Sequence, residues 1–321
     1  MRTLLACAGL VLTLSGSGIA AAPAAAQGTT TVRVAMTAAD DATPLLYAEK
    51  AGMFRRAGLS LEITAMRSGT VVTQAVIGGA ADIGRSSTLP LITAHAKGIP
   101  FTLVAPGGMY QANAPGAGIV VATTSTIRSA ADLNGKTVSV PGLKALSDIA
   151  FEAWIDKNGG DSTSIRYVEL PDAAIVAGLT DGRIAAAALE NPFFADALQS
   201  GKARLLGDDV SALGSHLLQT VWFSTIDYAT KNPDVIRRFA QVMRDAGNYT
   251  NAHHAETVEI LAAFAKMEPE TIARMTRAAQ APFIDPRDIQ PLIDAAFRYK
   301  VIEKRFDAAE LMSPLALKAS R

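Results

Sequence analysis

The chain has 321 residues, of which 30 are basic, 30 are acidic and four are histidine. This balance excludes the strongly basic surface that proteins use to bind the phosphate backbone, so we expect no nucleic-acid partner. The single cysteine excludes a disulfide scaffold and any metal site built from several thiolates.

The first 26 residues have the pattern of a cleaved secretory signal peptide. A basic residue precedes an apolar run over 4–14, and small residues lead to Ala24-Ala25-Ala26. The run is shorter than the roughly 20 residues of a membrane-spanning helix. We therefore predict cleavage that leaves Gln27 or Gly28 first, and a mature chain with no membrane insertion. Cys7 lies too near the N-terminus to be a lipid attachment site, so the mature chain has no cysteine.

Strand and helix patterns then alternate. Hydrophobic periodicity predicts strands at 32–36, 59–66, 81–84 and 101–105, separated by helices at 43–56, 70–77 and 88–97. Glycines follow each helix, where they end it. A series of βα units of this kind predicts a largely parallel sheet that helices cover on both faces.

An Ala-, Pro- and Gly-rich stretch at 112–118 predicts a crossing to a second series. Its expected strands are 119–122, 136–140, 165–169 and 184–189, with helices at 146–157, 173–180 and 192–199. Extended segments at 202–206 and 218–224 are expected to carry the chain back, followed by helices at 233–250, 255–266, 269–279 and 288–300. We therefore predict an α/β fold with two lobes, one of residues 28–114 and 218–321 and the other of residues 119–205.

Several short phrases carry a family resemblance by their order and spacing. They are Pro44-Leu45-Leu46-Tyr47-Ala48, Ser68-Gly69-Thr70, Gly79-Ala80-Ala81-Asp82-Ile83-Gly84, Asp132-Leu133-Asn134-Gly135-Lys136-Thr137-Val138 and Glu190-Asn191-Pro192. In this order the chain resembles the ABC-importer solute-binding proteins for nitrate, sulfonates and taurine, a family that also includes binders of thiamine precursors.

The resemblance implies a type II periplasmic-binding fold, with two α/β lobes joined by two crossover segments and a ligand in the cleft between them. It also implies a monomer in the periplasm that captures a small polar or anionic solute, such as a sulfonate, taurine, nitrate, a carboxylate or a pyrimidine. Its partners would be the permease subunits of an ABC transporter, and it would need no cofactor.

Candidate ligand-binding residues follow predicted strands, because strand ends and helix N-termini face the ligand crevice in such folds. In the first lobe these are small hydroxyl and glycine residues at helix starts: Thr43, Ser68, Gly69, Thr70, Ser86, Ser87 and Thr88. The sequence leaves open whether four charged neighbours, Asp40, Asp41, Arg67 and Arg85, face the cleft. Two carboxylates there would disfavour a simple anion.

In the second lobe, Lys144, Ser147, Glu190 and Asn191 occupy the equivalent positions. A carboxylate at 190 suits a ligand that carries an amine or a ring N–H. Trp222 and Phe223, near the second crossover, and Tyr110 could stack on a ligand, but burial in the core explains such aromatic residues equally well.

We find no motif for catalysis or metal binding. The four histidines, at 95, 216, 253 and 254, have no metal-ligand spacing, and the sequence contains no nucleophile elbow, P-loop or dinucleotide fingerprint. We therefore predict a binding protein with no catalytic residue. Two alternatives are an enzyme of pyrimidine-precursor synthesis on the same fold, which would require His and Cys chemistry, and a module that senses a ligand for a receptor.

Overall fold

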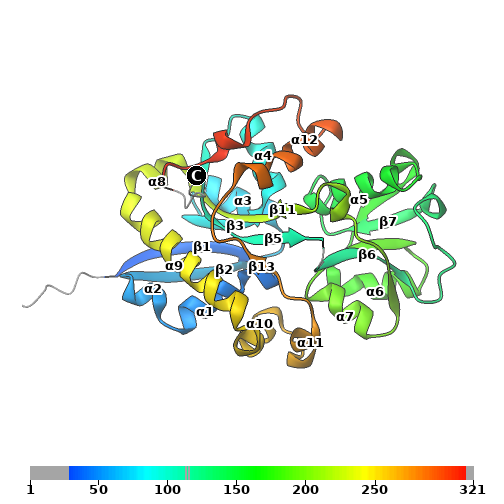
Figure 1. Cartoon of the computed structure of the whole chain (residues 1–321), viewed down its shortest axis with the longest axis horizontal. Coiled ribbons are helices and arrows are strands. Elements are labelled where there is room, and N and C mark those ends of the chain that lie inside the picture. The colour runs from blue at the N-terminus through cyan, green and yellow to red at the C-terminus, as the bar shows by residue number, and fades with distance from the viewer. Residues whose placement is uncertain (1–28, 113, 115, 316–321) are drawn as a thin grey trace, which may run out of the picture.

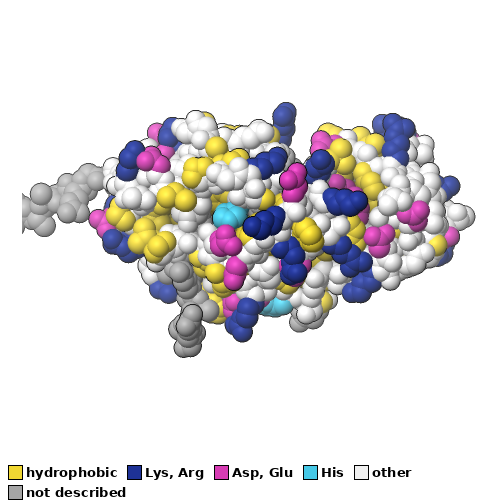
Figure 2. All heavy atoms as spheres, turned by 90° about the horizontal axis from the view of Figure 1, so that it is seen from above, with side chains coloured by type: hydrophobic (Ala, Val, Ile, Leu, Met, Phe, Trp, Pro, Cys, Tyr) yellow, Lys and Arg dark blue, Asp and Glu magenta, His cyan; other side chains and the backbone are white. Residues whose placement is uncertain are grey.

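The computed structural model describes residues 29–112, 114 and 116–315, so the predicted signal peptide, Cys7 included, lies outside the described residues. Two α/β parts lie side by side (Figure 1). Both ends of the described chain belong to one of them, the outer part, formed by residues 29–111 and 216–315. The continuous segment 117–207 forms the inner part. A furrow runs between the two parts, and basic and acidic side chains are interspersed on the face seen in Figure 2.

The outer part is built on a five-stranded sheet of order β2-β1-β3-β12-β4. β1 runs parallel to β2 and β3, as the βα pattern predicts, but β12 lies antiparallel between β3 and β4. The sheet is therefore mixed, because the chain that returns from the inner part forms β12, which runs in the direction opposite to β3 and β4. The strands are β1 Thr30–Thr37, β2 Leu59–Met66, β3 Ile83–Ser87, β4 Phe101–Pro106 and β12 Thr220–Thr225.

Helices cover both faces of this sheet (Figure 1). The longest, α9, buries Val235, Ile236, Phe239 and Met243, whose three- and four-residue spacing places them on one face. Phe239 packs on Trp222 of β12, with ring centroids 5.5 Å apart. The helices of the outer part are α1 Thr43–Lys50, α2 Met53–Arg56, α3 Gly69–Ile77, α4 Thr88–Ala96, α8 Ile226–Lys231, α9 Pro233–Ala252, α10 Val258–Ala265, α11 Pro269–Arg274 and α12 Gln290–Arg298.

The inner part repeats the design around a sheet of order β10-β6-β9-β7-β8. β7 is parallel to β8 and β9, whereas β6 is antiparallel to β9 and β10. The segment expected to return to the first lobe, 202–206, is instead mostly the edge strand β10, and the chain leaves only after Gly207. The elements are β6 Ala117–Ala122, β7 Thr137–Val140, α5 Leu146–Lys157, β8 Arg166–Glu169, α6 Asp172–Thr180, β9 Ala186–Glu190, α7 Phe193–Gln199 and β10 Ala203–Gly207.

A small antiparallel sheet lies where the two parts meet, in the order β11-β5-β13. β5 Gly108–Gln111 leads toward the inner part, β11 His216–Leu218 returns from it, and β13 Ala279–Gln280 comes from the C-terminal region. The sequence predicts a helix through 279, but α11 ends at Arg274 because Met275 takes an extended conformation. The C-terminal chain therefore forms a strand that pairs with β5, on the side opposite to β11.

Candidate functional site

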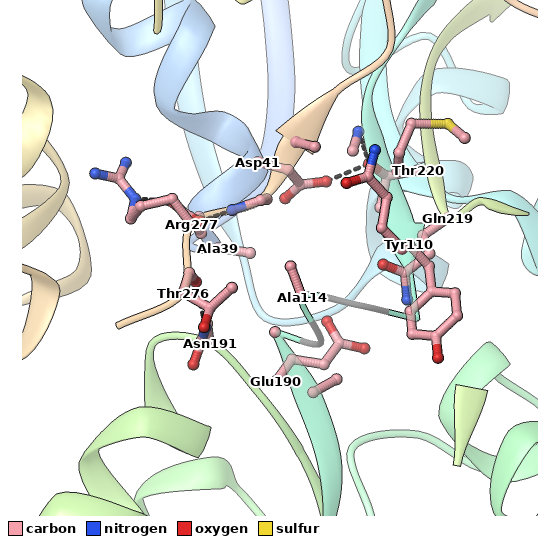
Figure 3. A pocket seen from close by; sticks show the side chains of 18 of the residues that line it. Ala39, Asp41, Tyr110, Ala114, Glu190, Asn191, Gln219, Thr220, Thr276 and Arg277 are labelled. Atoms are coloured by element: carbon pink, nitrogen blue, oxygen red, sulfur yellow. Dashed lines mark hydrogen bonds and ion pairs between the residues drawn. The ribbon is translucent and has the colours of Figure 1, made fainter. Parts of the chain in front are cut away.

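A cavity with a volume of about 90 Å³ lies between the two parts. Its wall combines both parts with the segments that connect them (Figure 3). The outer part contributes Ala39, Asp40, Asp41, Ser87, Gln219 and Thr220. The small central sheet and its flanks contribute Gly108, Met109, Tyr110, Gln111, Ala114, Gly116 and the segment 276–279, and the inner part contributes Ala117, Leu146, Glu190 and Asn191.

A buried ion pair holds one carboxylate of the outer wall. Asp41, in the turn after β1, bonds to the guanidinium of Arg85 on β3, and both side chains are less than a tenth exposed. The hydroxyl of Thr220 donates to the other oxygen of Asp41 and accepts the amide N–H of Gly108 at 2.8 Å. A side chain at 108 would clash, since its Cβ would lie 2.8 Å from the Cβ of Asp41. Glycine therefore lets β5 approach this carboxylate.

Asp40 makes a second buried pair. Its carboxylate accepts the Nε of Arg277 at 2.7 Å and the amide N–H of Ala278. The remaining guanidinium nitrogens bond to the hydroxyls of Thr43 and Thr257, each at 3.1 Å. Burial raises the pKa of Asp40, while the ion pair and the amide oppose the rise. All three nitrogens of Arg277 are therefore engaged by the protein.

The inner wall presents Glu190, the last residue of β9, and Asn191, which follows it; both line the cavity (Figure 3). Asn191 is buried: its Nδ2 donates to the carbonyl of Thr276 at 2.6 Å and its Oδ1 accepts the N–H of Ala195 in α7 at 3.1 Å. It thus joins the inner part to the segment after α11.

Glu190 differs from the other carboxylates of the wall, because its carboxylate has no ion pair among the described residues. Its side chain is exposed, and the space to which it is exposed includes the cavity that it lines. Desolvation by the surrounding walls, followed by the charges of Asp41 and Asp172, raises the pKa of Glu190 to about 7, against a smaller opposing influence of Arg85. Near neutral pH, Glu190 is therefore poised between its charged and neutral forms.

Two further carboxylates lie where the chain leaves the inner part. The hydroxyl of Tyr110 donates to Asp208 at 2.5 Å, which joins the two connecting segments. Asp209 is 2 % exposed, and one of its oxygens has no partner within the described residues. Burial, with the neighbouring Asp208, raises the pKa of Asp209 to about 7, and Glu190 contributes to the rise.

Only some predicted ligand-binding residues line the cavity. Ser87, Glu190 and Asn191 do, as do Asp40 and Asp41, whose orientation the sequence leaves open. The two hydroxyl loops of the first lobe do lie together: the hydroxyl of Ser86 donates to the carbonyl of Gly69 at 3.1 Å. Of these loops, however, only Ser87 reaches the cavity wall.

The other candidates have structural contacts outside the wall. The oxygen of Ser68 caps α3, which Gly69 and Thr70 begin. The hydroxyl of Thr88 donates to the carbonyl of Leu218 at 2.6 Å, and that of Thr43 to the carbonyl of Asp40 at 2.5 Å. Lys144 and Ser147 flank Leu146, which takes the place in the wall expected for them, and neither Arg67 nor Arg85 lines the cavity.

Trp222, proposed as a stacking residue or a core residue, does not line the cavity. It is 0 % exposed and packs on Phe239, because β12 is a central strand whose side chains are covered on both faces. Phe223 is equally buried. Tyr110 is the one of the three aromatic candidates that reaches the cavity wall.

Three residues that line the cavity were not predicted from the sequence: Gln219, Thr220 and Arg277. A parallel interpretation directs attention to residues that follow strands, whereas Gln219 and Thr220 stand at the start of an antiparallel strand. Arg277 lies in a segment whose pattern predicts helix. The signal that could have found it is the excess of acidic residues at 40 and 41, which required a buried cation from elsewhere.

The described residues contain neither a metal-site cluster nor a membrane-spanning helix. No group of three or more His, Cys, Asp or Glu side chains there has the arrangement of a metal site. Within the same ranges, no helix combines the length and apolar character needed to cross a bilayer.

Comparison with known proteins places the chain in a family. Over 255 residues it is 24% identical to the taurine-binding periplasmic protein of Escherichia coli, covering 78% of this chain and 74% of that protein. The solved structure of the periplasmic aliphatic sulphonate binding protein of Escherichia coli has a TM-score of 0.74 at 20% identity, covering 89% of this chain and 98% of that one. The periplasmic-binding-protein fold and the α/β class predicted from the sequence are thereby confirmed.

One relative carries the name of an enzyme. The 4-amino-5-hydroxymethyl-2-methylpyrimidine phosphate synthase of Legionella pneumophila is 25% identical over 229 residues, with 68% of each chain covered. The family model described as NMT1/THI5 like matches residues 39–257, about two thirds of the chain. The chain belongs to the NMT1/THI5-like family.

Proposed function

We propose that this protein is the solute-binding component of an ABC importer in the periplasm, and that it captures a small polar solute in the cavity between its two parts. The observation that carries the proposal is the composition of the wall, to which both parts and the connection that follows β5 contribute. A solute held there touches both parts and stabilises the form in which they are closed together. The relatives named as periplasmic binding proteins support the same function.

The proposed moving units are the two predicted lobes, residues 28–114 with 218–321, and residues 119–205. Their hinge would be the central sheet β11-β5-β13 with the Tyr110–Asp208 contact beside it. The closed form of a monomer would then dock on permease subunits of the transporter. A cleaved signal peptide ending near Ala26 would deliver the protein to the periplasm.

An enzymatic function finds no support in the cavity wall. The enzyme alternative requires His and Cys chemistry in the cleft, and no lining residue in the described part of the chain is His or Cys. Its carboxylates at 40 and 41 are already held by arginines. We therefore propose binding without catalysis, although one relative is named as a synthase.

A thermal-shift screen tests the proposal, with alkanesulfonates, taurine, nitrate, aromatic carboxylates, amidines and pyrimidines as probes. A solute at 100 times its dissociation constant stabilises the folded state by about 2.7 kcal/mol, which raises the melting temperature measurably. Small-angle X-ray scattering of each stabilised sample should show a smaller radius of gyration. Failure of every probe to stabilise the protein, or stabilisation accompanied by turnover of the probe, would contradict the proposal.

A further inference from the structure

The charges of the cavity wall do not cancel. Arg277 neutralises Asp40, and Arg85, behind the wall, neutralises Asp41. No other basic side chain lines the cavity among the described residues. Glu190 therefore remains as an uncompensated carboxylate, and its neighbours Asp41 and Asp172 both raise its pKa rather than lower it.

The helix N-termini at the cavity do not offset this negative charge. Helix N-termini attract anions through their free N–H groups. At the start of α7, however, Asn191 accepts the N–H of Ala195. The first turn that precedes α1 carries Asp40 and Asp41. The N-terminus of α4, which follows Ser87, has no side-chain cap and can bind a neutral polar atom as well as an anion.

A charged partner for Glu190 would resolve this imbalance. A ligand that fills the cavity removes water from the carboxylate of Glu190, and this loss of hydration is costly unless N–H groups of the ligand replace it with charge-assisted hydrogen bonds. Ser87, Gln111 and Gln219 of the same wall can satisfy the uncharged polar atoms of a ligand. An anion would instead meet Glu190 without any free cation to offset the repulsion.

We infer that the cavity selects a small organic cation, an amine or an amidine, whose N–H groups bind the carboxylate of Glu190. This inference rests on the proposed function, since it names the class of solute taken by the same cavity. The determinant at the inner wall is then an acid, which favours a solute that carries an ammonium or amidinium group over a simple anion.

The test compares ligands of equal shape and different charge. Benzamidinium, benzamide and benzoate are isosteric, as are acetamidinium, acetamide and acetate, and their dissociation constants can be measured by nuclear magnetic resonance titration above pH 7, where Glu190 is ionised. In one of the two series or in both, we expect the amidinium to bind at least about tenfold more tightly than the carboxylate. Equal or tighter binding of the carboxylate overturns the inference.

Two matched variants assign the effect to one side chain. Glu190→Gln keeps the shape and removes the charge, and should weaken amidinium binding about tenfold or more while leaving carboxylate binding unchanged or improved. Glu152→Gln is the control: burial raises the pKa of Glu152, like that of Glu190, to about 7, but Glu152 lies outside the cavity wall, so its loss should leave binding unchanged. Circular dichroism verifies that both variants are folded.

The possible failures can be told apart. If Glu190→Gln leaves amidinium affinity within twofold of the wild type, or if only carboxylates and sulfonates bind, the inference about the cation is wrong and the solute-binding function stands. If neither these probes nor those of the wider screen bind, the inference and the proposed function both fail.

Discussion

Replacing Asn191 with alanine should open the cleft. Its side chain makes two bonds: the one to the Thr276 carbonyl, at 2.6 Å, joins the two parts, and the one from the Ala195 N–H, at 3.1 Å, caps α7. A neutral hydrogen bond contributes about 0.5–1.5 kcal/mol. The variant should therefore lose about 1–3 kcal/mol of unfolding free energy. The bond between the parts alone should shift the opening equilibrium by roughly two- to thirteenfold.

The opening can be measured by energy transfer between dyes on cysteines introduced at Lys202 and Lys231, which are exposed and lie on different parts. Asn191→Asp separates the two bonds, because the carboxylate still accepts the Ala195 N–H but cannot donate to Thr276. It should open the cleft with a smaller loss of stability. Thr225→Ala removes a cap within the outer part alone, the bond from the N–H of Tyr228 at 3.1 Å, and should not change the dye separation. An unchanged separation in both Asn191 variants would refute the reasoning.

Four other outcomes are expected. Arg85→Leu leaves Asp41 buried without its ion-pair partner, and should lower the free energy of unfolding, measured by urea denaturation, by about 3–5 kcal/mol. Asp41→Asn in the same chain should restore part of this loss. An unchanged free energy of unfolding in Arg85→Leu would show that the ion pair is not needed for stability. Trp222→Ala should lower the free energy of unfolding by about 3–5 kcal/mol and leave the dissociation constant of any bound probe unchanged. A loss of affinity without a loss of stability would instead support a stacking role for Trp222. The pKa of Asp209 is raised from 3.8 to about 7, so the folded state holds its proton more tightly and the stability is lost as pH rises through 7. Asp209→Asn should therefore stabilise the protein above pH 7 and not below pH 3.8, and a pH-independent difference in urea denaturation would contradict this. Because the pKa of Glu190 is about 7, benzamidinium should bind more tightly above pH 7 than below it. Glu190→Gln should abolish that pH dependence. The charged groups that influence the pKa of Glu190 are Asp41, Asp172 and Arg85.

The fold was largely predictable, because its signals are local. Alternating strand and helix patterns, with glycines at the helix ends, gave the order of most elements. Strand direction does not depend on local sequence. The strands β12 and β6 run antiparallel to their neighbours because the chain enters each sheet from the other part, and hydrophobic periodicity carries no information about that direction. The same limit explains 202–206, whose extended pattern fits an edge strand as well as a connection.

The site was predictable where a strand leads directly into the cavity, as it does before Ser87 and before Glu190 and Asn191. It was not predictable where a side chain reaches the wall from a distant segment. Arg277 pairs with Asp40 across 237 positions of sequence, and no periodic pattern links the two. For Trp222 the sequence left both stacking and burial open, since an aromatic side chain near a crossover is equally compatible with the core in which it lies.

The position of Arg277 has a consequence for biosynthesis. The inner part is one uninterrupted stretch that ends at Gly207, so it can fold while later residues are still being added by the ribosome. The outer sheet cannot be completed until β12 has emerged, and Asp40 and Thr43 have no cation to pair with until residue 277 follows. A nascent chain that stops short of this point carries an unneutralised acid beside an unfinished cavity. Capture of a solute therefore has to wait for a residue synthesised more than two hundred positions after Asp40, its partner in the wall.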